Sequence, residues 1–154
     1  MNKTLLSLIN ILLFLLLFHG VGISSEVKRE VLRFSSDTAQ IKKSDGILHL
    51  SGEVKISYGQ YVIRSGILMA KTNSIGSPEV KIIEASKNIY FSNNKDISAK
   101  GDKLFMDVDK KFVSIEGNVE FSQGKSIIRA EKINVDLVTE TVDFEGIKDS
   151  FIKN

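Results

Sequence analysis

LHLSGEVKISYGQYVIRSGILMA, residues Leu48–Ala70, decides the fold, and the same pattern returns 65 positions later as VSIEGNVEFSQGKSIIRAEKINV, residues Val113–Val135. In both stretches apolar residues recur at every second position, which is the period of a β-strand. Gly52 and Gly117 occupy matched places within the copies. A repeated strand-turn-strand unit indicates a sheet built from like modules. The copies contain no catalytic group, which indicates that this protein binds a partner rather than catalyses a reaction.

The remaining chain predicts more strands of the same kind, about a dozen in all. Segments Ala39–Lys43, Val80–Ala85, Asn88–Ser92, Asp96–Ala99, Asp102–Asp109 and Thr141–Gly146 read as short strands, and Phe34–Asp37 and Lys71–Glu79 read as a turn and a loop. Strands that alternate apolar and polar residues bury one face, so this many must fold into facing layers. Glycines within strands mark bends. We therefore expect an all-β protein whose curved antiparallel sheet folds over itself, without a long helix.

The N-terminus resembles a secretory signal. Met1–Thr4 is basic, Leu5–Phe18 is almost wholly apolar, and small residues including Gly22 and Ser24 follow. These are the three regions of a cleaved signal peptide. A retained membrane anchor is the alternative, although Leu5–Ile23 is only marginally long enough to span a bilayer. We expect residues 1–25 to be the cleaved signal peptide and residues 26–154 to be one exported domain.

Composition narrows the function classes. Removing residues 1–25 leaves 20 basic and 19 acidic residues, a near balance that argues against a nucleic-acid partner. The chain has no cysteine, so its core must be stable without disulfides, and no lipid is attached to an N-terminal cysteine. A core built from roughly 125 residues is large enough for that.

A family resemblance rests on short motifs in order along the chain. The second copy carries Gly117-Asn118-Val119, Gln123-Gly124 and Ile128-x-Ala130-x-x-Ile133-x-Val135, and the first copy repeats them loosely from Gly52 to Gly66. Leu32-x-x-Ser35-Ser36-Asp37-x-Ala39 precedes them, and Ile97-x-Ala99-x-x-Asp102-x-Leu104 lies between. Together with the leader, this resembles the periplasmic lipopolysaccharide-transport protein A family (LptA, OstA-like) over residues 32–146. The first copy departs from the pattern at Glu53 and Tyr58, and the tail after Gly146 is short.

The resemblance implies an antiparallel β-jellyroll with an apolar groove between its sheets, located in the periplasm. The resemblance implies that such proteins join edge strand to edge strand into a bridge. The bridge carries lipopolysaccharide, held by its lipid A part, from an inner-membrane relay subunit to an outer-membrane assembly protein. No cofactor is expected, and the sequence carries no motif that indicates an enzyme.

Apolar side chains at period 2 suit this task because burying each methylene of a lipid contributes about 0.8 kcal/mol. The candidate lining consists of inward-facing residues: Leu50, Ile56, Ile63, Leu68, Ile82, Ile89, Phe91, Leu104, Met106, Ile115, Phe121, Ile128, Ile133 and Phe144. The same residue types also make an ordinary dry core, and the sequence leaves both interpretations open.

Charged residues give weaker signals. Arg64 and Arg129 occupy matched positions and could contact lipid phosphates, but outward-facing charges are the simpler interpretation. Asp107 and Asp109 adjoin the turn at Lys110 and Lys111 and are interpreted as solvated charges. His49 lies on a polar face, and once the signal peptide is cleaved it is the only histidine left, so it has no histidine partner for a metal site. No serine-nucleophile elbow or phosphate loop is present.

Edge strands near Val31 and Phe144 carry few blocks to pairing. Pairing between them would join molecules head to tail in a contact that does not close on itself. Two alternatives to the bridge protein remain: a membrane-anchored relay subunit of the same machinery, of the transport protein C type, and a structural β-repeat protein with a closed core.

Overall fold

The computed structural model describes residues 31–72 and 79–152, and these form ten strands and one short 3-10 helix. The elements are β1 (Leu32–Ser35), β2 (Thr38–Lys42), η1 (Lys43–Asp45), β3 (Ile47–Tyr58), β4 (Tyr61–Thr72), β5 (Val80–Ser92), β6 (Ile97–Asp107), β7 (Phe112–Gln123), β8 (Ser126–Asp136), β9 (Thr141–Glu145) and β10 (Asp149–Phe151). The predicted signal peptide, residues 1–25, lies wholly outside the described residues, and the predicted loop 71–79 lies largely outside them.

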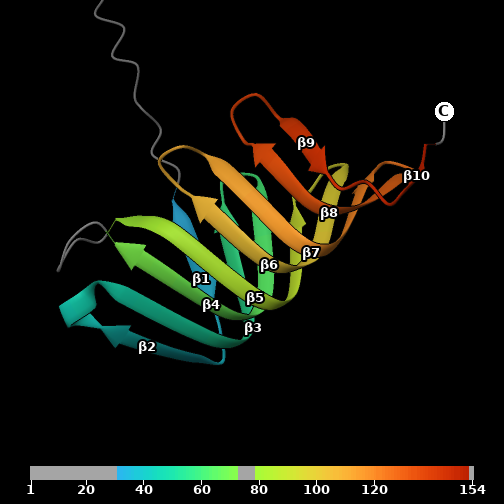
Figure 1. Ribbon diagram of the computed structural model, residues 1–154. Helices are drawn as coiled ribbons and strands as arrows, with labels where there is room; N and C mark the ends of the chain where they lie inside the picture. The colour runs from blue at the N-terminus through green and yellow to red at the C-terminus, as the bar shows by residue number, and fades with distance from the viewer. Residues whose placement is uncertain (1–30, 73–78, 153–154) are drawn as a thin grey trace, which may run out of the picture.

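All strand pairs are antiparallel, in the order β1-β3-β4-β5-β6-β7-β8-β10. β2 pairs with the first half of β3, and β9 pairs with the second half of β8. Each long strand from β3 to β8 bends near its middle, so the sheet doubles back on itself (Figure 1). Each long strand contributes one half to each of two layers. Sheet I consists of β2, β9 and the strand halves between them, and sheet II consists of β1, β10 and the other halves. The expectation of an all-β, curved jellyroll is confirmed.

The bends occur where the strand register shifts. In β3 the shift falls between Ser51 and Val54, and in β7 between Glu116 and Val119. The glycine at each place has a left-handed backbone, with φ of 74° at Gly52 and 80° at Gly117. Only glycine adopts this conformation without a steric penalty, so the matched glycines of the sequence repeat are bulge residues that bend the sheet.

An acidic side chain lies against each of these glycines. A Cβ added at Gly52 would lie 2.2 Å from Asp37 Oδ2, and one at Gly117 would lie 2.4 Å from Asp102 Oδ2. Asn118 Nδ2 donates to Asp102 Oδ2 at 2.9 Å. Each bend therefore requires glycine for two reasons: the left-handed φ, and the neighbouring carboxylate that occupies the space where a Cβ would lie.

Several predicted boundaries are wrong in an instructive way. The segments expected as separate strands at 80–85 and 88–92 form one strand, β5, that continues through left-handed Lys87 and Asn88. Likewise β6 runs through the expected break near residue 100. The turn predicted at 34–37 is half strand, since β1 includes Phe34 and Ser35. Within the described residues no α-helix occurs, as expected.

Candidate functional site

The apolar residues of the two sheets line up in rows that run across the strands. In sheet I the cross-strand partners form the row Leu50, Leu68, Ala85, Leu104, Ile115, Ile133 and Phe144. In sheet II they form the row Phe34, Ile56, Ile63, Phe91, Ala99, Phe121 and Ile128. We call the surfaces that carry these rows the inner face, because their buried members pack into one hydrophobic cluster.

Most of the predicted lining lies on this inner face. Eleven of the fourteen residues are at most 4 % exposed: Leu50, Ile56, Ile63, Leu68, Ile89, Phe91, Leu104, Met106, Ile115, Phe121 and Ile133. Ile128 and Phe144 are half-buried, near the last strands. The expected inward orientation of Ile82 is wrong, because it pairs with Lys71 on the opposite face while Ile83 is 0 % exposed and points inward. The cluster also contains four valines that are not among the predicted lining residues: Val54, Val113, Val119 and Val135.

The inner face reaches the surface at the two ends of the rows. At the end formed by β1 and β2, Leu32 and Leu48 are partly buried, and Phe34 and Ile41 are exposed. At the end formed by β9, Val142 and Phe144 are partly buried. The Phe144 ring packs edge-on against Phe121, with centroids 5.2 Å apart. The apolar layer is thus closed in its middle and accessible at its ends.

The two matched arginines lie on the outer face of sheet II. The Arg64 guanidinium is 5.8 Å from the centre of the Tyr90 ring, a cation–π contact. Arg129 bonds to Glu120 and Asp149, each at 3.2 Å. Neither points toward the inner face, which agrees with the outward-charge interpretation and removes the geometric basis for a phosphate contact beside the buried rows.

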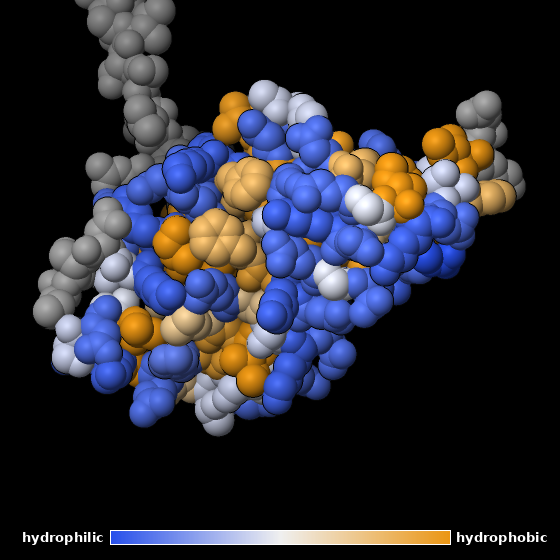
Figure 2. Space-filling view, viewed as in Figure 1, coloured by the Kyte–Doolittle hydropathy of each residue, from blue (hydrophilic) through white to orange (hydrophobic). Residues whose placement is uncertain are grey.

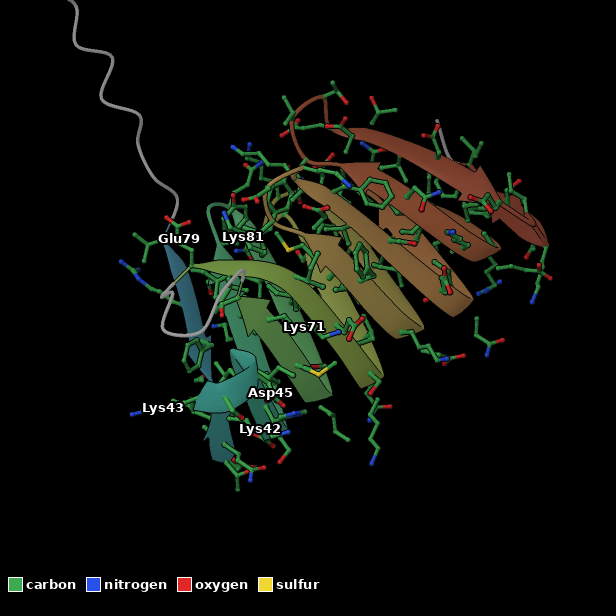
Figure 3. The ribbon with its side chains drawn as sticks, turned by 60° about the vertical axis from the view of Figure 1, so that its left-hand side comes forward. Lys42, Lys43, Asp45, Lys71, Glu79 and Lys81 are labelled. Carbon is green, nitrogen blue, oxygen red and sulfur yellow. The ribbon has the colours of Figure 1, made fainter. Side chains whose placement is uncertain are left out.

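Charged residues also gather at the loop ends of sheet I. In Figure 3, Lys42, Lys43 and Asp45 lie around η1, Glu79 and Lys81 lie together at the start of β5, and Lys71 lies on β4. Lys81 Nζ contacts Asp109 at 2.9 Å and Glu79 at 3.3 Å. These are exposed ion pairs of small individual energy.

The aspartates serve local structure. The Lys110 backbone N–H donates to Asp107 at 3.0 Å and lowers the pKa of that carboxyl, and N–H groups of Thr139 and Val138 do the same for the pKa of Asp136. Among residues 31–72 and 79–152 no group of three or more His, Cys, Asp or Glu side chains is placed to hold a metal ion. In that same part of the chain no helix has the length and hydropathy needed to cross a membrane.

Comparisons with known proteins agree with this geometry. The profile of the family described as LptA/(LptD N-terminal domain) LPS transport protein matches residues 34–141, so the chain belongs to this family of lipopolysaccharide-transport proteins. A similar solved structure is that of LptH from Pseudomonas aeruginosa, titled the LptA homologous periplasmic component of the lipopolysaccharide transport device. It has 17 % sequence identity and a TM-score of 0.71, and the match covers 81 % of this chain and 96 % of that one. At this identity the likeness shows the shared fold. A search of curated proteins gave no match.

Proposed function

We propose that this protein carries lipopolysaccharide through the periplasm on its inner face and that it does so as a link in an end-to-end bridge. The observation that carries the proposal is the pair of uninterrupted apolar rows across β3 to β8, accessible at both ends. The family membership supports the same cargo class.

The physical reason is the cost of exposing hydrocarbon to water. An acyl chain of about a dozen carbons leaves roughly 10 kcal/mol unshielded in water, at about 0.8 kcal/mol per methylene. Cross-strand rows offer this chain an apolar contact at each strand, so no single position holds it much more tightly than the next. Since the inner side chains in the middle are nearly fully buried, the two sheets separate locally to admit a chain, beginning at the β9 end where Phe144 is half-buried.

Exposed apolar side chains at opposite edges support end-to-end assembly. At one edge Val31 is 64 % exposed and Phe34 49 % exposed, and at the other Phe151 is 60 % exposed and Ile152 67 % exposed. Pairing β1 of one molecule with β10 of the next would continue sheet II across the junction. The terminal molecules would pair in the same way with the inner-membrane relay subunit and the outer-membrane assembly protein.

The experiment that tests cargo binding introduces a charge at the accessible end. Phe144→Glu places a carboxylate beside Phe121 and should weaken lipopolysaccharide binding by the purified protein at least tenfold. Val138→Glu is the matched control, because Val138 is 68 % exposed in the β8–β9 loop and should bind as the unaltered protein does. Equal binding by both variants would contradict entry at this end.

Two other functions remain as outcomes of measurement. A structural protein with a permanently closed core would bind no lipopolysaccharide in any variant, and the deep burial of the inner rows is the observation that favours it. A membrane-anchored relay subunit would retain residues 1–25, which mass spectrometry of the intact protein from cells would reveal.

A further inference from the structure

Sheet I also carries apolar side chains on the side away from the core. The outer row pairs His49 with Met69, Met69 with Glu84, Glu84 with Phe105, and Phe105 with Ser114. Ile67 lies beside this row and is 37 % exposed, and Phe105 is 38 % exposed. Figure 2 shows apolar side chains in a hollow of the molecular surface, bordered by charged residues.

The hollow is a pocket of about 450 Å³, lined by Ile67, Met69 and Phe105 together with polar groups that include His49, Lys103 and Ser114. This volume is within the range of roughly 300–1,000 Å³ typical of small-molecule sites. Ala85 and Leu104 of the inner row also border it, but they are buried, whereas Ile67, Met69 and Phe105 lie on the opposite face, because successive residues of a strand point to opposite faces. We call it the outer pocket.

A polar group without a partner borders the outer pocket. Ser114 is 7 % exposed, and its Oγ has no hydrogen-bond partner. Buried polar atoms are nearly always hydrogen-bonded, so the unpartnered Ser114 hydroxyl indicates that a bound group accepts its hydrogen bond.

The charges around the outer pocket indicate the sign of that group. Glu84 and Glu116 also line the pocket, and each is paired with a lysine: Glu84 contacts Lys71 at 3.0 Å, and Glu116 contacts Lys132 at 3.3 Å. Lys103 also lines the pocket but makes no ion pair with any residue that the structure describes. The cation left without a partner favours an anionic head group.

From these observations we propose that the outer pocket binds one single-chain anionic amphiphile, a fatty acid. Its chain lies against Ile67, Met69 and Phe105, and its carboxylate lies near Lys103 and accepts a hydrogen bond from Ser114. This site is separate from the inner face and does not depend on the proposed cargo. It would hold a free fatty acid while the inner face is empty or filled.

The three methionines make the test selective, because Met69 lines the outer pocket, Met106 belongs to the core cluster, and Met1 lies in the leader. Protein labelled with ¹³C at the methionine methyl groups is titrated with laurate below its micelle concentration. The Met69 methyl signal should shift and saturate. Lys103→Gln should weaken binding about threefold, as expected for an exposed charge pair. Ser114→Ala should weaken it about fivefold, as expected for one hydrogen bond.

Phe105→Glu should abolish the Met69 shift, and Ile67→Glu is the second variant if the first does not fold. Val138→Glu is the control and should bind laurate normally. A Met69 signal that does not move, or that still moves with the Phe105→Glu protein, overturns the outer site. A shift of Met106 alone also overturns it, while supporting binding on the inner face. Laurate binding at Met69 with no response to lipopolysaccharide at Met106 would instead support the outer site and contradict the proposed cargo route.

Discussion

Replacing Gly117 by alanine tests whether the bend in the sheet depends on close approach as well as on backbone conformation. Gly117 has a φ of 80°, and an added Cβ would lie 2.9 Å from Asp102 Cβ and 2.4 Å from its Oδ2. Rotation of the Asp102 side chain would relieve the second contact but not the first, because Cβ is fixed to the β6 backbone. The strands would have to separate at the point where the sheet folds.

The expected cost has two parts. A left-handed conformation costs a non-glycine residue about 1–2 kcal/mol. Forcing an extra methyl group into a filled space costs a further 1–3 kcal/mol, roughly. Gly117→Ala should therefore lower the free energy of unfolding by about 2–5 kcal/mol. Gly124→Ala is the matched control, because its φ is 57° and nothing lies within 4 Å of an added Cβ, so only the first part applies.

Urea unfolding followed by circular dichroism measures both variants. At a slope of about 1–3 kcal/mol per molar urea, the extra loss in Gly117→Ala should lower the midpoint by roughly 1 M relative to Gly124→Ala. If the two alanine variants lose equal stability, the contact with Asp102 does not limit the bend, and this reasoning is wrong.

Three further predictions follow from the same structure. Ile115→Ala, at a side chain that is 0 % exposed, should cost about 2–5 kcal/mol of unfolding free energy in urea, whereas Lys132→Gln, which breaks exposed ion pairs only, should cost less than about 1 kcal/mol. The pKa of Asp136 in the folded protein is lowered from 3.8, so the unfolded chain binds the proton more readily and stability should fall as pH drops below that value; Asp136→Asn should flatten this dependence in urea titrations from pH 6 to pH 2. The unaltered protein should form longer assemblies at higher concentration in sedimentation velocity, and Phe34→Asp should remain monomeric while Val138→Asp assembles normally.

The sequence predicted the fold well because alternation directly reports a buried face. The repeat at residues 48–70 and 113–135 matches strand pairs β3–β4 and β7–β8 almost to the residue, and its Gly52 and Gly117 are the bulge residues. The sequence predicts two separate strands in place of β5, because Lys87 and Asn88 have the polar character of a turn. Pairing with both neighbouring strands holds β5 together through that point, and this information lies outside the segment itself.

The candidate lining was predicted less completely. Ile82 and Ile83 are adjacent, and the sequence gives no reason to choose which one points inward; the pairing of Lys71 with Ile82 decides it. The outer pocket was missed because Ile67, Met69 and Phe105 come from different strands and become neighbours only through the register. The buried state of Ser114 likewise depends on its cross-strand partner Phe105.

The central claim, that lipid chains travel along the inner face, is tested most directly by photocrosslinking in cells. A photoreactive residue is placed at Ile56 or Phe121 on the inner face, and at Lys55 or Glu120, their outward-facing neighbours, as controls. The account predicts lipopolysaccharide adducts at the two inner positions and few or none at the outer ones. Adducts at neither inner position, in protein that is folded and exported, would contradict it and leave the inner rows as a dry core.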